Sequence, residues 1–206
     1  MTDVDPADAV TACLAAHERL FTTVATVDDE TARRASALPG WTVGHVLTHV
    51  ARNADGHARR LEGSLRGEDL PRYAGGSAER DAGIEAGAGR PAAELRTDVE
   101  ESARRLEATW ARCAEAGWPN PHFLGGDKFP IPASPLRRLR EVEVHHVDLD
   151  LGYQATDWLD AYVDWEIAHT LKRLPGRLTP TDARRLLAWL TGRADLPTDL
   201  KLGPWM

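Results

Sequence analysis

Apolar residues recur along most of this chain at every third or fourth position, which predicts helices rather than strands. A first helix is predicted from Pro6 to about Val27. A second is predicted from Trp41–Thr42 to Gly67, with Thr42 as its N-cap. The apolar stripe of this second helix consists of Val43, Val46, Leu47, Val50, Ala54, Ala58, Leu61 and Leu65.

Two further long helices are predicted over residues 91–116 and 134–151, opened by prolines. Between the second and third helices, residues 68–90 are rich in glycine and read as a loop with a short helix near 77–86. Residues 118–133 hold four prolines and predict an ordered loop or a crossing segment. Four helices of this length predict an all-α fold, a four-helix bundle.

The helical pattern changes after Gly152. Two short helices are predicted there, over about 158–174 and 181–191, joined by proline-rich turns. The expected organisation is therefore a bundle over residues 1–152 and a small C-terminal region over 153–206.

Composition narrows the function classes. The chain has 206 residues, 42% of them hydrophobic, and a formal net charge of −7 at pH 7. An acidic chain without basic blocks is a poor nucleic-acid binder, and no apolar stretch is long enough to cross a membrane. The acidic N-terminal sequence is unlike a signal peptide, so a cytoplasmic monomer or homodimer is expected.

Cysteine and histidine usage limits the chemistry. Cys13 and Cys113 are too few for a disulfide framework or a thiolate zinc site, and both are expected to be buried core thiols. Eight histidines are present, so a metal would be bound by imidazole and carboxylate. The chain has no G-x-S-x-G elbow, Walker A motif or dinucleotide-binding fingerprint.

The fourth helix carries two polar wedges separated by valine and leucine. The first wedge consists of Glu141, His145 and Asp148, and the second of Glu143, His146 and Asp150. One wedge should meet solvent and the other should point into the bundle, but spacing alone does not decide which. A Glu and a His four positions apart project from one face and make a workable pair of metal ligands. An ordinary surface ion pair is the alternative.

A third candidate ligand is His49 on the second helix, which lies beside the apolar stripe. A histidine in that place can also be a core or boundary residue without a ligand. Two imidazoles and one carboxylate would leave an open position on zinc, which is typical of catalytic sites. Near the C-terminus, Arg193 is a candidate anion-binding residue or, alternatively, an arginine that only stabilises a helix end.

Two sequence segments resemble a known family. The motifs G-W-T-x-x-H-x-x-x-H, ending at His49, and R-E-V-x-x-H-x-V-D-L, beginning at Arg140, are similar to those of the mycothiol-dependent maleylpyruvate isomerases, which are related to DinB-like metal-binding bundles. The resemblance implies a zinc ion, or another divalent metal, held by His49, Glu141 and His145. It also implies that the Glu141 wedge faces inward, while Glu143 and His146 face outward.

The resemblance assigns roles to further residues. Asn53 and Asp148 lie within the motif segments and are expected to line or support the cofactor site, with Asp148 orienting a metal ligand. Arg193 is expected, less directly, to hold substrate carboxylates. Family members usually carry an α/β domain after the bundle, but no strand pattern follows Gly152, so a reduced C-terminal region is expected.

The implied cofactors are the metal and mycothiol, and the implied partners are a small-molecule thiol and a carboxylate substrate. Because neither cysteine lies in a candidate ligand motif, the reactive thiol would come from mycothiol. The implied reaction converts maleylpyruvate to fumarylpyruvate by thiolate addition, bond rotation and elimination. The alternatives are a mycothiol S-transferase, which would release the adduct, and a non-catalytic metal-binding regulatory bundle.

Overall fold

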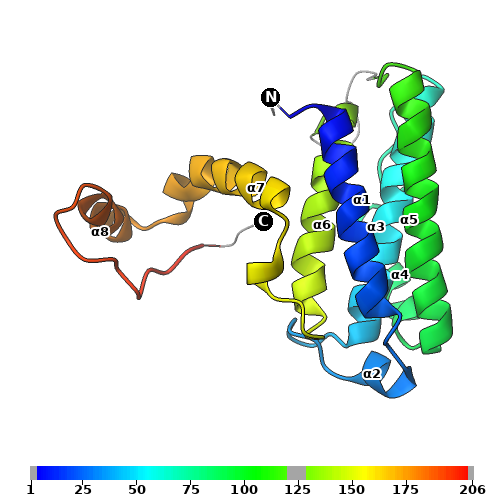
Figure 1. The fold of residues 1–206 in the computed structure, drawn as a ribbon, viewed down its shortest axis with the longest axis horizontal. Helices are drawn as coiled ribbons and strands as arrows, with labels where there is room; N and C mark the ends of the chain where they lie inside the picture. Colours follow the sequence, from blue (N-terminus) through cyan, green and yellow to red (C-terminus); the bar gives the residue numbers. More distant parts are fainter. Residues whose placement is uncertain (1–3, 120–128, 204–206) are drawn as a thin grey trace. The chain divides into compact units, whose positions relative to one another are not determined.

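The computed structural model describes residues 4–119 and 129–203, and these residues form helices joined by turns (Figure 1). Within them there is no β-strand, and an isolated antiparallel bridge joins Ala35 to Thr42. The all-α prediction is confirmed. None of the described helices is long and apolar enough to cross a membrane.

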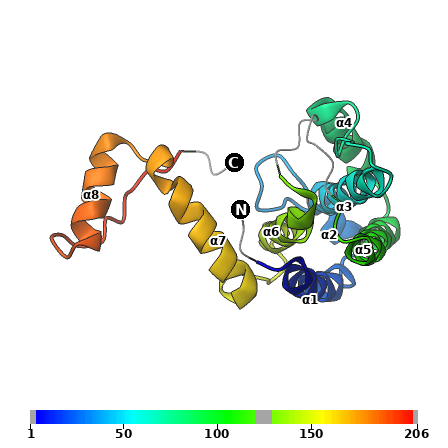
Figure 2. The ribbon, with the colours of Figure 1, turned by 90° about the horizontal axis from the view of Figure 1, so that it is seen from above.

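The chain divides into two compact units, Met1–Tyr162 and Val163–Met206. The first unit contains the predicted four-helix bundle, seen end-on in Figure 2. Its four long helices are α1 (Pro6–Val24), α3 (Val43–Leu65), α5 (Ala92–Glu115) and α6 (Ser134–Asp148). Helices α1 and α3 each pack against both α5 and α6. Their apolar stripes share one core, in which the fully buried leucines include Leu20, Leu47, Leu61, Leu106 and Leu139.

The helix ends follow local sequence signals. Thr42 is the N-cap of α3, as predicted: its side chain accepts a hydrogen bond from the backbone N–H of His45, and the His45 ring accepts one from the backbone N–H of Thr42. Helix α1 ends at Val24, before the predicted position, and a short helix α2 (Asp29–Arg33) follows. Helix α6 ends at Asp148 because Asp150 adopts a left-handed conformation, with φ +55°.

Helix α4 (Gly76–Ala88) packs along α3, where the sequence predicts a short helix inside a loop. Glycines allow this close approach: a Cβ at Gly44 would overlap the carbonyl oxygen of Ala88, and a Cβ at Gly87 would overlap the Thr48 side chain. Because Thr48 directly precedes His49 in the sequence, these contacts fix α4 beside one of the candidate ligands.

The second unit is helical as well. It contains most of α7 (Asp160–Arg173), then the 3₁₀ turn η3 (Leu174–Arg177) and α8 (Pro180–Leu190). These elements confirm the two short helices expected in the C-terminal region. The division into a bundle over 1–152 and a reduced region over 153–206 stays a prediction.

Candidate metal centre

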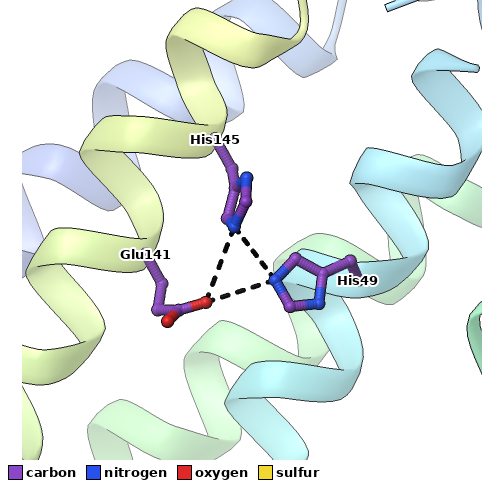
Figure 3. A group of neighbouring side chains, drawn as sticks. All are labelled: His49, Glu141 and His145. Atoms are coloured by element: carbon purple, nitrogen blue, oxygen red, sulfur yellow. Dashed lines mark hydrogen bonds and ion pairs between the residues drawn. The ribbon is translucent and has the colours of Figure 1, made fainter. Parts of the chain in front are cut away.

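The structure brings the three predicted metal ligands together (Figure 3). His49 projects from α3, and Glu141 and His145 project from neighbouring turns of α6. His49 Nε2 lies 3.2 Å from Glu141 Oε2 and 3.0 Å from His145 Nε2, and the third side of the triangle, His145 Nε2 to Glu141 Oε2, is 3.6 Å. The three donor atoms therefore face one common point.

This spacing matches the requirement of a small divalent ion. Nitrogen and oxygen ligands about 2.0–2.1 Å from a tetrahedral zinc lie about 3.3 Å from one another. The measured distances of 3.0, 3.2 and 3.6 Å bracket that value. Two imidazoles and one carboxylate are also a donor set that divalent zinc, iron and nickel accept. The residues fit a metal ion with at least one coordination position left open.

The cluster is sheltered but not sealed. His49 is only 3% exposed, while the side chains of Glu141 and His145 are 17% and 12% exposed. The Trp41 ring meets His49 edge-on, with 5.7 Å between the ring centroids. The two imidazoles lie at 88° to each other, with 4.5 Å between their centroids. A ligand can approach from the side on which Glu141 and His145 reach the surface.

Asp148 orients one of the two imidazoles. Its Oδ2 lies 2.8 Å from His145 Nδ1, so it accepts the Nδ1 proton and leaves Nε2 for the cluster. Its backbone carbonyl accepts a hydrogen bond from the backbone N–H of Ala37, at 2.9 Å, in the loop that leads into α3. Asp148 therefore lies where the sequence expects support for a metal ligand, and direct binding of the cofactor stays a prediction.

Burial and charge act differently on the three ligands. Burial opposes ionisation of Glu141, but hydrogen bonds from His145 and His49 outweigh it and hold the pKa of Glu141 well below its usual value. Burial likewise opposes a charge on His145, but Asp148 and Glu141 outweigh it and raise the pKa of His145 to about 9. Burial lowers the pKa of His49. A metal ion would thus displace a proton from His145 at neutral pH.

Asn53 lies one turn beyond His49 on α3 and is 2% exposed. Its Oδ1 accepts a hydrogen bond from Arg138 Nη1 at 3.0 Å, and the same Nη1 reaches the Val50 carbonyl at 2.8 Å. Arg138 is fully buried and also donates from Nε to His17 Nε2, at 3.1 Å. Asn53 thus has a structural partner in the bundle core, and its proposed contact with the cofactor stays a prediction.

The second wedge of α6 corrects an expectation. Glu143 and His146 were expected to face outward, but they are only 1% and 2% exposed. Glu143 Oε2 accepts a hydrogen bond from the Tyr153 hydroxyl at 2.6 Å, and His146 Nε2 lies 2.7 Å from Thr23 Oγ1. The His146 ring stacks on Tyr153 with 3.7 Å between centroids. Helix α1 and the chain that follows α6 cover this wedge, so both polar faces of α6 are sheltered.

The cysteines match the expectation of buried core thiols. Cys13 and Cys113 are free and fully buried, and burial raises the pKa of both thiols, that of Cys113 to about 11. Neither belongs to the His49–Glu141–His145 cluster. A thiolate at this cluster would have to come from another molecule.

Arg193 belongs to the second unit and follows α8. Its guanidinium donates to the backbone carbonyl of Thr191, the C-cap of α8, which agrees with the alternative of a helix-end arginine. Its role toward substrate stays a prediction. Arg80 of α4, in contrast, was not predicted, yet its Nη2 lies 3.4 Å from His49 Nδ1. No spacing rule connects two helices whose residues are this far apart in sequence.

The fold and the cluster define a DinB-like helical bundle with a candidate metal centre between two of its helices. A family model described as the mycothiol maleylpyruvate isomerase N-terminal domain matches residues 13–150, which include the whole cluster. The chain belongs to this family.

Solved structures agree with this assignment. The crystal structure of a mycothiol-dependent maleylpyruvate isomerase superimposes with a TM-score of 0.75 at 25% identity, covering 82% of this chain and 70% of that one. A histidine-to-alanine mutant of a mycothiol-dependent maleylpyruvate isomerase gives 0.74 with the same identity and coverage. No curated protein matches the chain.

Proposed function

We propose that this chain is a metal- and mycothiol-dependent isomerase that converts maleylpyruvate to fumarylpyruvate. The observation that carries the proposal is the convergence of His49, Glu141 and His145, whose donor atoms lie within 4.8 Å of one another in a chain of this family. The crystal structures that it resembles are of mycothiol-dependent maleylpyruvate isomerases, which supports the choice of thiol and substrate.

The three residues would hold zinc or another divalent cation through two imidazole nitrogens and one carboxylate oxygen. When bound there, the metal lowers the pKa of a coordinated thiol, so that the thiol is available as a thiolate at neutral pH. Three protein ligands leave room for such a thiol, which is the pattern of a catalytic rather than a structural site.

Residues of this chain orient and shield the proposed metal ligands, while the reactive thiol would come from another molecule. Asp148 accepts the Nδ1 proton of His145 and thereby keeps the ring turned so that its Nε2 faces the cluster. Trp41 lies against His49 and excludes water from one side. Cys13 and Cys113 are buried away from the cluster and protonated, so they do not compete as nucleophiles.

In the proposed reaction, the thiol adds to the cis double bond of the substrate, rotation follows about the resulting single bond, and the thiol leaves to give the trans isomer. The thiol is regenerated, so the product differs from the substrate only in the geometry of the double bond. Asn53 and Asp148 are proposed to support the thiol site, and Arg193 to bind a substrate carboxylate.

A metal analysis coupled to a turnover assay tests the proposal. The purified chain should contain about one divalent ion per molecule and should convert maleylpyruvate only when mycothiol is present. His49→Gln should lose the metal and the activity. His45→Gln is the matched control on the same helix, because glutamine can replace the His45 side chain in the capping box at Thr42.

The outcomes separate the competing functions. A stable thiol adduct in place of the trans isomer would identify an S-transferase. Stoichiometric metal without turnover of any thiol substrate would support a regulatory bundle. Full activity in His49→Gln, or wild-type protein without divalent metal after reconstitution, would contradict the proposed metal centre.

A further inference from the structure

The two histidines of the cluster have opposite surroundings. The outer nitrogen of His145 faces a carboxylate, Asp148, which is the usual partner of a metal-bound histidine. The outer nitrogen of His49 faces the guanidinium of Arg80, at 3.4 Å. A guanidinium has only N–H donors and no acceptor. Among the described residues, no orienting acceptor like that of His145 faces His49.

His49 is a poor partner for Arg80. The contact between Arg80 Nη2 and His49 Nδ1 is 3.4 Å long, beyond the usual length of such a hydrogen bond. A neutral imidazole that binds metal through Nε2 carries its proton on Nδ1, so it offers a guanidinium no acceptor. Arg80 therefore faces the candidate metal centre with an N–H group that a ligand can accept from.

Arg80 is held close to the cluster even so. It projects from α4, which the contacts of Gly44 and Gly87 fix against α3 beside His49. Its Nη1 bonds Asp81 at 2.7 Å, an exposed ion pair that leaves Nη2 for another acceptor. The Arg80 side chain is 33% exposed, so a ligand from solvent can reach it.

A second donor lies nearby. The ring of Tyr73 lies against α3 at Gly56, two turns beyond His49. Its hydroxyl is buried and has no hydrogen-bond partner in the described part of the chain. Burial raises the pKa of Tyr73, against the opposing charges of Arg72 and Arg80. A buried hydroxyl without a partner favours a ligand that accepts a hydrogen bond.

We propose that Arg80, assisted by Tyr73, binds a carboxylate of the substrate at the metal centre. The inference rests on the proposed metal centre and deepens it. It places one carboxylate contact inside the bundle, in addition to any contribution from Arg193. A substrate carboxylate supplies the acceptor that a metal-bound His49 does not offer, and a guanidinium can bind it through two N–H groups.

Maleate is a suitable probe, because it has the cis dicarboxylate of the substrate and can be tested without any thiol. Its binding is measured by calorimetry on the full chain, with and without Zn²⁺. Arg80→Gln should weaken maleate binding about tenfold or more in the metal-loaded protein. Arg80→Lys keeps the charge and should recover part of the affinity.

Metal affinity is the second readout. Competition with a chromophoric chelator should show that Arg80→Gln binds Zn²⁺ about two- to fivefold more tightly than wild type, because a repelling charge and an opposing donor are gone. Arg33→Gln is the matched control: Arg33 is a helical arginine of α2 that donates to the Asp29 carbonyl. This control should change neither affinity.

Each outcome bears on the inference. Unchanged maleate affinity in metal-loaded Arg80→Gln would overturn the carboxylate contact, even if the metal binds normally. A wild-type chain that binds no divalent ion would overturn the proposed metal centre as well, which distinguishes that failure from a failure of Arg80 alone.

Discussion

The two polar faces of α6 use the same residue types for different purposes. On one face, Glu141 and His145 point at a residue from α3 and leave a gap of atomic size between three donor atoms. On the other, Glu143 and His146 are closed off by Tyr153 and Thr23, each bonded to a single neutral hydroxyl. A glutamate and a histidine become a candidate ligand pair only where a further ligand converges on them.

Electrostatics separates the two faces as clearly as geometry does. Burial opposes a charge on both consecutive histidines, but two carboxylates overcome it at His145 and raise its pKa to about 9. No carboxylate bonds His146 in the described structure, and burial, assisted by Arg19, lowers its pKa to about 4. Adjacent positions in the sequence thus differ because carboxylates are bonded to only one of them.

The largest contrast is expected from removing the charge of each glutamate in turn. Glu141→Gln should weaken metal binding by more than about a hundredfold, because the anionic ligand is lost and only two imidazoles remain. Glu143→Gln, the matched change on the other face, should bind metal as wild type does. Metal content after dialysis and chelator competition measure both. Equal metal affinity in the two variants would end the distinction between the faces.

Acid should destabilise the fold at His17, a buried residue of α1 that bonds Arg138 of α6 outside the metal face. Burial lowers the pKa of His17 to about 4, against the opposing pull of Glu107, and Arg138 of α6 lowers it further. Cys13 and Arg104 are the other titratable groups near it. Between pH 6.5 and 4 the unfolded chain binds a proton here that the folded chain does not, so the free energy of unfolding should fall by about 3 kcal/mol as the pH drops.

Urea unfolding of the metal-free protein across this pH range measures the effect. His17→Gln should be less stable at neutral pH, yet its stability should depend less on pH over the same interval. An unchanged slope in the variant would show that other groups cause the acid sensitivity.

A smaller effect is expected where Asp148 supports His145. Asp148→Asn keeps the size of the side chain but removes the negative charge that orients and polarises the ring. Metal affinity should fall by about 10- to 100-fold, while the fold is retained. Chelator competition gives the affinity, and circular dichroism checks the fold. A wild-type affinity would mean that the bond between Asp148 and His145 is not needed to orient the ligand.

The smallest effect is expected on the covered face. Tyr153→Phe removes the hydroxyl that bonds Glu143, whose pKa burial already raises. The loss should lower the free energy of unfolding by about 1–2 kcal/mol and leave metal affinity unchanged. In the Glu143→Gln background the same change should cost less, because no buried carboxylate is left without its donor. A large effect of Tyr153→Phe on metal affinity would link the two faces.

The sequence predicts the ligand set more reliably than it predicts its surroundings. Helical periodicity and the two motifs are enough to select His49, Glu141 and His145, and the structure brings these residues together. Periodicity gives the angle between side chains around one helix, but not what packs against each side. The family resemblance placed Glu143 in solvent, whereas Tyr153 and Trp158 bond its side chain and its backbone carbonyl.

Arg80 shows the same limit. The sequence around it reads as a glycine-rich loop with a short helix, and nothing in that segment points to α3. Its place depends on two glycines, Gly44 and Gly87, that allow α4 to approach closely. Their effect is visible only when both helices are seen together. Arg138 was not predicted either, although it lies three residues before Glu141 on the same helix, where that spacing places both on one side.

Asp148 also bears on whether the site could be transplanted. Its side chain bonds His145, the ligand on α6, while its backbone carbonyl accepts a hydrogen bond from Ala37 in the loop that leads into α3 and His49. Arg34 Nη2 donates a second hydrogen bond between the same two segments, to the Asp150 carbonyl at 2.8 Å. A designer who grafts only the three ligand side chains onto another bundle would lose these hydrogen bonds, which help to set the separation of α3 and α6. The portable unit is the pair of helices together with residues 34–42.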